Sequence, residues 1–99
     1  MVTLISPLAV DSADEKEFLS GWKNLLEWLR SKDGFRAARL QRSVSPSAPF
    51  RFVGMSMWDS QAAITAALDD PRFLELSDAI PVRISPTVYE IIEEVTGNA

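Results

Sequence analysis

Two different spacings of apolar residues divide the chain into strands and helices. Residues 2–9 (VTLISPLA) are β-branched and apolar, which predicts a strand with Pro7 at an edge or at its end. Further along, apolar residues recur every three or four positions, as on one face of an amphipathic helix that reaches about Lys32. The residues on that face are Phe18, Trp22, Leu25 and Leu29.

Local signals mark both ends of this helix. Ser12 to Glu15 reads S-A-D-E, the pattern of a capping box, in which Ser12 accepts a hydrogen bond from an amide of the first turn and Glu15 reaches back. Gly34 stands where a residue of left-handed conformation commonly ends a helix. We therefore expect the helix to follow Ser12 directly.

A hairpin of two strands is expected next. Residues Phe35–Ser43 and Phe50–Trp58 both favour strands. Between them, residues 45–49 (SPSAP) contain two prolines, which interrupt a strand ladder, and two serines, which favour turns. The two strands should therefore be antiparallel neighbours.

Two helices follow the hairpin. Asp59 or Ser60 caps an alanine-rich helix that extends to Leu68. Asp70 and Pro71 then have the residue types that begin a new helix, with the acid at the cap and the proline in the first turn. This second, short helix carries Phe73 among its apolar residues.

The last strand completes the fold. Residues 81–87 contain two prolines and are expected to be irregular, whereas Thr87–Val95 favours a strand. The order is β-α-β-β-α-β, which predicts one α+β domain over residues 1–99, with an antiparallel four-stranded sheet and its helices on one face.

The third strand has two apolar faces, which predicts a partner. Phe52, Gly54 and Trp58 lie on one face, while Met55 and Met57 lie on the other. A sheet with helices on one side only should alternate apolar and polar residues, and this strand does not. A second copy packed face to face is the simplest cover, so we expect a homodimer.

Composition and charge remove several classes of function. Hydrophobic residues make up 46% of the chain and charged residues 24%, as in folded domains. The net charge of −4 and the scattered basic residues argue against nucleic-acid binding. No apolar run is long enough to cross a membrane and no signal peptide is recognisable, so we expect a cytoplasmic protein without a membrane partner.

The residue types that are missing limit the chemistry further. The chain has no Cys and no His, which removes thiolate and imidazole catalysis, disulfides and the common zinc sites. No glycine-rich nucleotide motif and no calcium-binding loop occurs. We expect no metal and no cofactor.

Trp58 is the candidate centre of any chemistry. It ends a predicted strand and shares a face with Gly54 and Ser56, whose small side chains leave a hollow beside it. A hollow with aromatic walls and few polar groups is typical of a small-molecule site. Gly54 is equally compatible with a second interpretation, in which it only makes room for a large helix side chain.

Charged residues offer weaker candidates. Arg39 and Arg83 could pair with an anionic or phenolate oxygen, although a surface ion pair explains either one. Glu90 and Glu94 share a predicted strand face and could act as acid or base, but a solvated edge strand explains them as well. Ser85 has no neighbouring base and is not expected to be a nucleophile.

Three segments together resemble the antibiotic biosynthesis monooxygenase (ABM) family, and the closing residues 86–90 (PTVYE) also fit. The three are residues 17–22 (EFLSGW), residues 33–35 (DGF) followed by 39–42 (RLQR), and residues 50–60 (FRFVGMSMWDS). The most specific parts are the Gly-Phe after the first helix and the Trp-Asp-Ser that ends the third strand. The resemblance implies a ferredoxin-like half-barrel that pairs into a dimeric α+β barrel.

The resemblance also implies a chemistry, with important departures. Well-understood members oxidise electron-rich phenolic polyketides with molecular oxygen and neither metal nor flavin. In those members an Asn stands four residues before the Trp that matches Trp58, and here that position is Gly54. Many relatives carry a His before the Pro of the last strand, where this chain has Ile84 and Ser85, and the haem-degrading branch needs an axial His that is absent here.

Three functions remain open from the sequence. The first is a cofactor-free monooxygenase of an aromatic or polyketide-like molecule, in which Trp58 donates its indole N–H and Arg83 or Arg39 supplies charge. The second is a cyclase or isomerase of such a molecule without oxygen, and the third is a non-catalytic dimer with a ligand-binding, accessory or purely structural role. The expected residues of a binding site are Trp22, Phe52, Gly54, Ser56, Phe73 and Tyr89.

Overall fold

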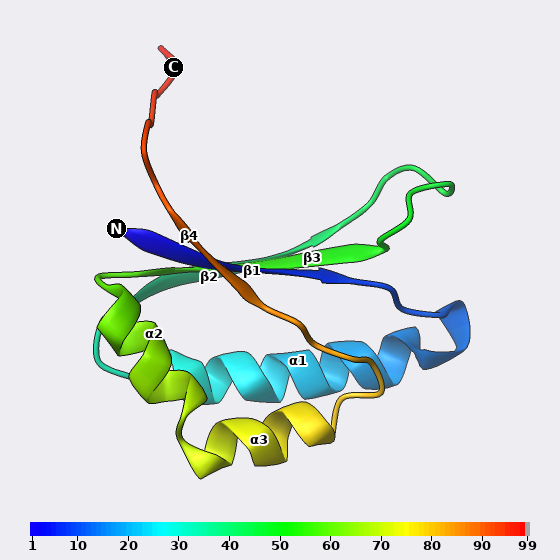
Figure 1. Cartoon of the computed structure of the whole chain (residues 1–99). Coiled ribbons are helices and arrows are strands. Elements are labelled where there is room, and N and C mark those ends of the chain that lie inside the picture. The colour runs from blue at the N-terminus through cyan, green and yellow to red at the C-terminus, as the bar shows by residue number, and fades with distance from the viewer. Residues whose placement is uncertain (99) are drawn as a thin grey trace.

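A computed structural model describes residues 1–98, in which a four-stranded sheet carries all of the helices on one face (Figure 1). The elements in chain order are β1 (Val2–Leu8), a 3-10 turn η1 (Ser12–Asp14), α1 (Glu15–Leu29), β2 (Phe35–Arg42), β3 (Phe52–Trp58), α2 (Gln61–Leu68), α3 (Pro71–Asp78) and β4 (Thr87–Glu90).

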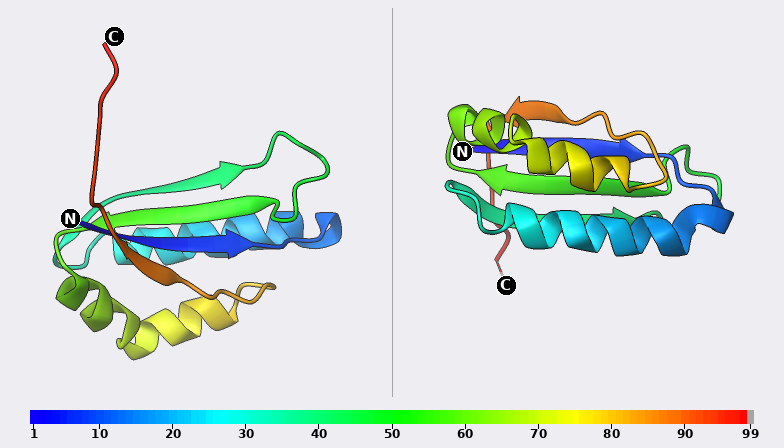
Figure 2. Two further views of the ribbon diagram at one scale, coloured as in Figure 1. Left: turned by 45° about the horizontal axis from the view of Figure 1, so that its top comes forward. Right: turned by 90° about the horizontal axis from the view of Figure 1, so that it is seen from below.

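The sheet has the order β2-β3-β1-β4, and every neighbouring pair is antiparallel. Seen from below, the helices lie in front of the sheet, with α1 along one side of it and α2 and α3 along the other (Figure 2, right). The opposite face carries no helix, and the C-terminal segment rises from that side (Figure 1). The predicted fold class, an α+β arrangement with an antiparallel four-stranded sheet, is confirmed.

The start of α1 differs from the prediction. The expected capping box is wrong, because Ser12 lies inside the 3-10 turn and neither η1 nor α1 has a side-chain cap. The amide of Asp14 instead donates to the carbonyl of Asp11, which closes the turn, and α1 begins at Glu15. Regular α-helix ends at Leu29, and single turns continue to Lys32.

Gly34 has the expected left-handed conformation, but it does not end α1, which is capped at Arg30. Its φ is +87°, a left-handed conformation that glycine adopts without a steric penalty. The hairpin then forms as predicted, except that β3 begins at Phe52 rather than at Phe50. Phe50 is exposed and lies outside the ladder, in which the terminal pair joins Arg42 to Phe52.

Capping fixes the two helices that follow β3. Ser60 accepts from the amide of Ala63, and Asp70 accepts from the amide of Arg72, so both predicted caps are present. Lys32 also donates to Asp70 at 2.8 Å, which ties the beginning of α3 to the end of α1. Chiefly because of this hydrogen bond, the pKa of Asp70 lies below its usual value.

The last strand is shorter than predicted, since β4 ends at Glu90 and not at Val95. The reason lies in its neighbour: β1 begins at Val2, which pairs with Glu90, and beyond that residue β1 offers no further partner. One more hydrogen bond joins the amide of Ile91 to the carbonyl of Met1. The segment after Ile91 then leaves the sheet (Figure 1).

The core lies between the sheet and the helices. On β3 the buried residues alternate with half-buried ones, so one face of the strand points toward the helices. On β1 the same alternation holds except at Thr3, which is buried next to Leu4. No helix within residues 1–98 is long and apolar enough to cross a membrane. The buried apolar side chains are Leu4, Leu8, Phe18, Trp22, Leu25, Leu29, Phe52, Trp58, Ile64, Ala67 and Ile80.

Candidate functional site

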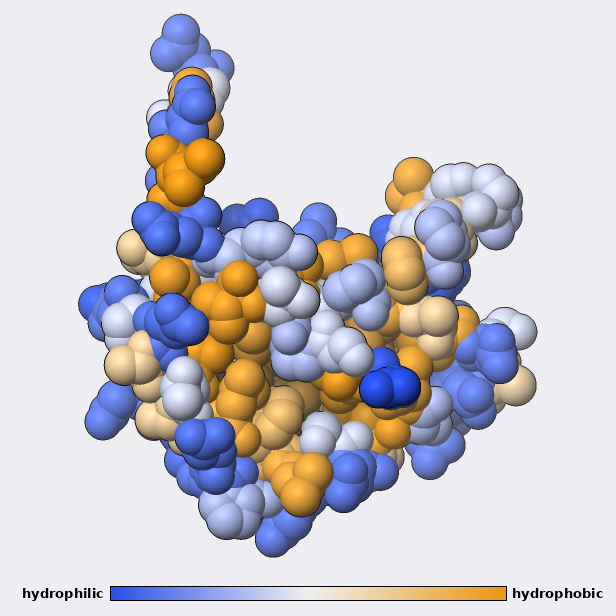
Figure 3. All heavy atoms as spheres, in the orientation of Figure 1, coloured by the Kyte–Doolittle hydropathy of each residue, from blue (hydrophilic) through white to orange (hydrophobic). Residues whose placement is uncertain are grey.

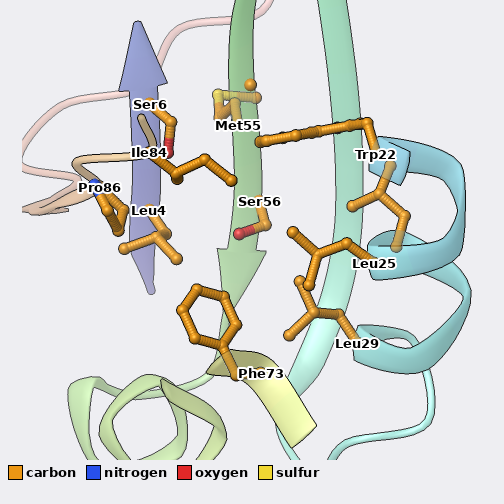
Figure 4. Close-up of a pocket in the computed structure, with 12 residues that line it drawn as sticks. Leu4, Ser6, Trp22, Leu25, Leu29, Met55, Ser56, Phe73, Ile84 and Pro86 are labelled. Carbon is orange, nitrogen blue, oxygen red and sulfur yellow. The ribbon is translucent and has the colours of Figure 1, made fainter. Parts of the chain in front are cut away.

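A small cavity lies within the core, between the β1–β3 strand pair and the helices α1 and α3 (Figure 4). Its volume is about 30 Å³, enough for about one water molecule. A single benzene ring needs roughly 150 Å³, so an aromatic ligand requires the walls to move apart. The lining residues are Leu4, Ser6, Trp22, Leu25, Leu26, Leu29, Gly54, Met55, Ser56, Phe73, Ile84 and Pro86.

Trp22 forms the wall above Gly54. The indole extends from α1 toward β3, and a Cβ at position 54 would overlap its six-membered ring. Gly54 therefore accommodates a large helix side chain, one of the two interpretations that the sequence left open. The missing side chain does not leave an empty hollow, because Trp22 fills the space.

Trp58 lies behind the wall of the cavity. Its side chain is 0% exposed, and it packs edge-on against Phe35, with ring centroids 5.3 Å apart and an angle of 88°. Its Nε1 donates to Ser56 Oγ at 2.8 Å. The indole N–H that was expected to meet a substrate is thus already bonded to Ser56, and Trp58 is not among the residues that line the cavity.

The N–H of Trp22, unlike that of Trp58, has no hydrogen-bond partner within residues 1–98. The residue is 7% exposed, and its Nε1 is buried without any hydrogen-bond partner within residues 1–98. A buried donor without a partner costs about 1–3 kcal/mol. Trp22 therefore lines the cavity and also carries a buried donor that has no partner.

Four of the predicted site residues line the cavity, namely Trp22, Gly54, Ser56 and Phe73. The remaining four lie elsewhere. Phe52 is buried against Phe18, with centroids 4.9 Å apart, and Tyr89 is 52% exposed on a short edge strand. Arg83 is exposed and does not line the cavity, so its role, like that of Trp58, stays a prediction.

Sequence reasoning missed the second hydroxyl of the cavity. Ser6 is buried on β1 opposite Gly54, and its oxygen points into the cavity, as does that of Ser56 (Figure 4). The signal was present in the alternation of β1, because Ser6 shares a face with Leu4 and Leu8. Because Ser6 alternates with two core leucines, the strand pattern alone indicates that this polar residue faces the core.

The cavity lining is uncharged. None of its residues is ionisable, so the protein places no acid, base or fixed charge on these walls. Within residues 1–98, no three His, Cys, Asp or Glu side chains gather in a way that could hold a metal ion. The arrangement can enclose an apolar molecule and offer serine hydroxyls to an oxygen atom.

Residues 1–79 match the protein family described as antibiotic biosynthesis monooxygenase. The chain belongs to this family. The family match covers every lining residue of the cavity except Ile84 and Pro86. No curated protein matches the chain.

Solved structures support the same fold for this family member. SnoaB from Streptomyces nogalater, described as a cofactor-independent oxygenase, is 19% identical, with a TM-score of 0.82 over 97% of each chain. A protein from Deinococcus radiodurans that bears the family's name is 20% identical, with a TM-score of 0.83 over 100% of each chain. Rv0793 from Mycobacterium tuberculosis is 16% identical, with a TM-score of 0.75, and the match covers 96% of this chain and 98% of that one.

Proposed function

We propose that the chain is a cofactor-independent oxygenase that acts on a compact aromatic or polyketide-like molecule in the core cavity. The observation that carries the proposal is the cavity itself: apolar walls with two serine hydroxyls, set against the sheet of a family fold. Once they move apart to admit a ring, walls of this kind suit a flat molecule with few polar atoms. Membership of the family supports oxygenation as the reaction.

Without a cofactor, the substrate itself must supply the electrons. For a methylene group between aromatic rings the balanced reaction is R₂CH₂ + O₂ → R₂C=O + H₂O. One oxygen atom enters the product, the other leaves as water, and the carbon loses all four electrons. The step begins when the substrate loses a proton and becomes an electron-rich enolate or phenolate.

The uncharged walls determine where that proton goes. Because no lining residue ionises, the substrate loses its proton to solvent, and the cavity receives the anion. Hydrogen-bond donors then hold the anionic oxygen while the apolar walls exclude water. The pH dependence of the rate should therefore follow the acidity of the substrate and shift when a more acidic analogue replaces it.

Oxygen uptake with anthrone as the probe tests the reaction. We expect one O₂ consumed per anthrone, at a rate well above that in buffer, with anthraquinone as the product. With ¹⁸O₂, one labelled atom should enter the quinone and one should appear in water. A rate equal to that of the buffer blank would reject the proposed oxygenation.

A matched pair of variants on α3 locates the reaction. Phe73 lines the cavity, whereas its neighbour Leu74 is exposed. Phe73→Ala should lower the rate of anthrone oxidation about tenfold or more, because it removes a wall against which the ring packs. Leu74→Ala should leave the rate unchanged, and an equal loss in both variants would place the reaction outside this cavity.

A second function has one observation in its favour. The absence of an ionisable side chain on the cavity walls leaves no group to generate a carbanion, which suits a cyclase that shapes its substrate or a binding protein without catalysis. In that case anthrone would raise the melting temperature under argon and in air alike. Binding without oxygen uptake would favour this function over the oxygenase.

We also propose that two copies pair through the helix-free face of the sheet. Val53, Met55 and Met57 of β3 are only half-buried there, beside Ile5 of β1. Among the residues of the C-terminal segment, which rises from the same face, Ile92 is 90% exposed and Val95 is 84% exposed. Apolar atoms are visible on this segment in Figure 3. A second copy packed on this face would cover both the half-buried residues of the sheet and the exposed apolar residues of the C-terminal segment.

The oligomeric state tests this pairing. Light scattering after size-exclusion chromatography should give twice the mass of the chain. Met57→Asp, on the helix-free face, should shift the mass toward the monomer, because pairing would bury the new charge. Val44→Asp at the exposed hairpin tip is the matched control and should not change the mass. A monomer at all concentrations would reject the homodimer.

A further inference from the structure

The hydrogen bond between Trp58 and Ser56 leaves one proton without a partner. An indole N–H can only donate, whereas a serine hydroxyl both donates and accepts. Trp58 Nε1 donates to Ser56 Oγ at 2.8 Å, so the bond occupies an acceptor position of the serine. It is the one hydrogen bond of Ser56 Oγ within residues 1–98, and the hydroxyl proton therefore remains free.

The free proton is available to the cavity. Ser56 is buried, lines the cavity, and directs its oxygen into it (Figure 4). Trp58 behind it is enclosed completely and held edge-on by Phe35, so the N–H that orients the serine is rigidly placed. Accepting a hydrogen bond also strengthens a hydroxyl as a donor, because linked hydrogen bonds polarise one another.

A second hydroxyl lies within reach of the same ligand atom. In the register of β1 and β3, Leu4 faces Ser56 and Ser6 faces Gly54. Ser6 and Ser56 are thus diagonal neighbours on one face of the sheet, a relation that places Cβ atoms roughly 7 Å apart or less. A single oxygen atom can lie between two hydroxyls at that separation. Trp22, whose N–H has no partner within residues 1–98, also lines the cavity.

From this arrangement we infer that Ser56, with Ser6 beside it, binds an oxygen atom of the ligand, and that Trp58 is a positioning residue that acts through Ser56. The inference deepens the proposed function and rests on it for the presence of an aromatic ligand. The ligand class is a ring system with a carbonyl or phenolate oxygen. Its oxygen meets neutral groups only, since no lining residue carries a charge.

A pair of probes that differ in one oxygen tests the assignment. 1-Tetralone and tetralin share a bicyclic carbon frame, and only the ketone offers an acceptor. The wild-type protein should bind the ketone roughly three- to tenfold more tightly, the effect of one or two neutral hydrogen bonds. Ser56→Ala should abolish the preference, while Ser85→Ala, at an exposed serine beside the lining residue Ile84, should retain it.

Trp58→Phe separates positioning from packing. Loss of the orienting N–H should reduce the preference for 1-tetralone and leave the affinity for tetralin unchanged, whereas a merely structural defect would weaken both. The carbonyl stretching frequency of bound 1-tetralone gives a second readout. It should be lowered in the wild type and should rise toward the unbonded value in both Ser56→Ala and Trp58→Phe.

Several results would overturn the inference. They are equal binding of both probes by the wild type, binding of neither probe, or an unchanged preference in Ser56→Ala. An unaltered preference and frequency in Trp58→Phe would remove the positioning role. By contrast, intact discrimination between the probes without oxygen uptake from anthrone would reject the oxygenase and leave this oxygen site standing.

Discussion

Trp22 and Trp58 are two buried indoles of one core, and their N–H groups have opposite fates. Trp58 stands on β3 and donates to Ser56 on the same strand face. Trp22 comes from α1, lies over Gly54, and its N–H has no partner within residues 1–98. One tryptophan thus supports Ser56 through a hydrogen bond, whereas the other lines the cavity and has an N–H without a partner.

The core face of β3 explains this difference. It presents Gly54, Ser56 and Trp58 at alternate positions. The glycine makes room for the ring of Trp22 but offers it no acceptor, while the serine satisfies Trp58. The unpaired donor belongs to a residue that lines the cavity, and the paired donor belongs to a residue that lies behind the lining.

Among the variants that test this comparison, Gly54→Ala is expected to change the free energy of unfolding most. A Cβ at this position would overlap the ring of Trp22, so the indole or the strand must shift, which costs about 3 kcal/mol of the free energy of unfolding. In a Trp22→Ala background the same change should cost less than about 0.5 kcal/mol, because the ring is gone. Urea unfolding of the four proteins measures the coupling.

The control for this cycle is Gly97→Ala, since nothing lies within 4 Å of a Cβ at that position. It should leave the unfolding free energy unchanged. An equal cost of Gly54→Ala with and without Trp22 would contradict the view that Gly54 exists to accommodate the indole.

A smaller effect is expected from Trp58→Phe. The change removes the N–H that donates to Ser56, and it also removes some buried volume. Together these losses should lower the free energy of unfolding by about 2 kcal/mol. In Trp58→Phe combined with Ser56→Ala, the loss should be smaller than the sum of the two single losses, because both remove the same hydrogen bond. Additive losses would mean that the hydrogen bond contributes nothing to stability.

Much of the fold could be predicted because it depends on local spacing. The helical period of α1, the prolines of the hairpin turn and the caps at Ser60 and Asp70 each act within a few residues. Two boundaries depended on partners distant in sequence or on a competing turn. The end of β4 is set by where β1 begins, and Ser12 lost its capping role because Asp11 starts a 3-10 turn before it.

The candidate site was less predictable. Strand alternation places Trp58 on the core face with Ser56, but it does not reveal that the indole turns its N–H back to that serine. That choice depends on side-chain torsions and on packing against Phe35. Likewise, Gly54 reads as a hollow until the position of Trp22 on α1 is known.

The smallest effect is expected from Trp22→Phe, and it provides the sharpest contrast. The change removes bulk as Trp58→Phe does, but the N–H that it deletes is a buried donor without a partner. Losing that donor should return about 1–3 kcal/mol and offset the lost packing, so the net change in unfolding free energy should be near zero. A loss as large as that of Trp58→Phe, measured in the same urea titration, would mean that the Trp22 N–H is satisfied in solution. Both indole N–H groups would then be hydrogen-bonded. The contrast between Trp22, on the cavity wall, and Trp58, which supports Ser56, would be lost.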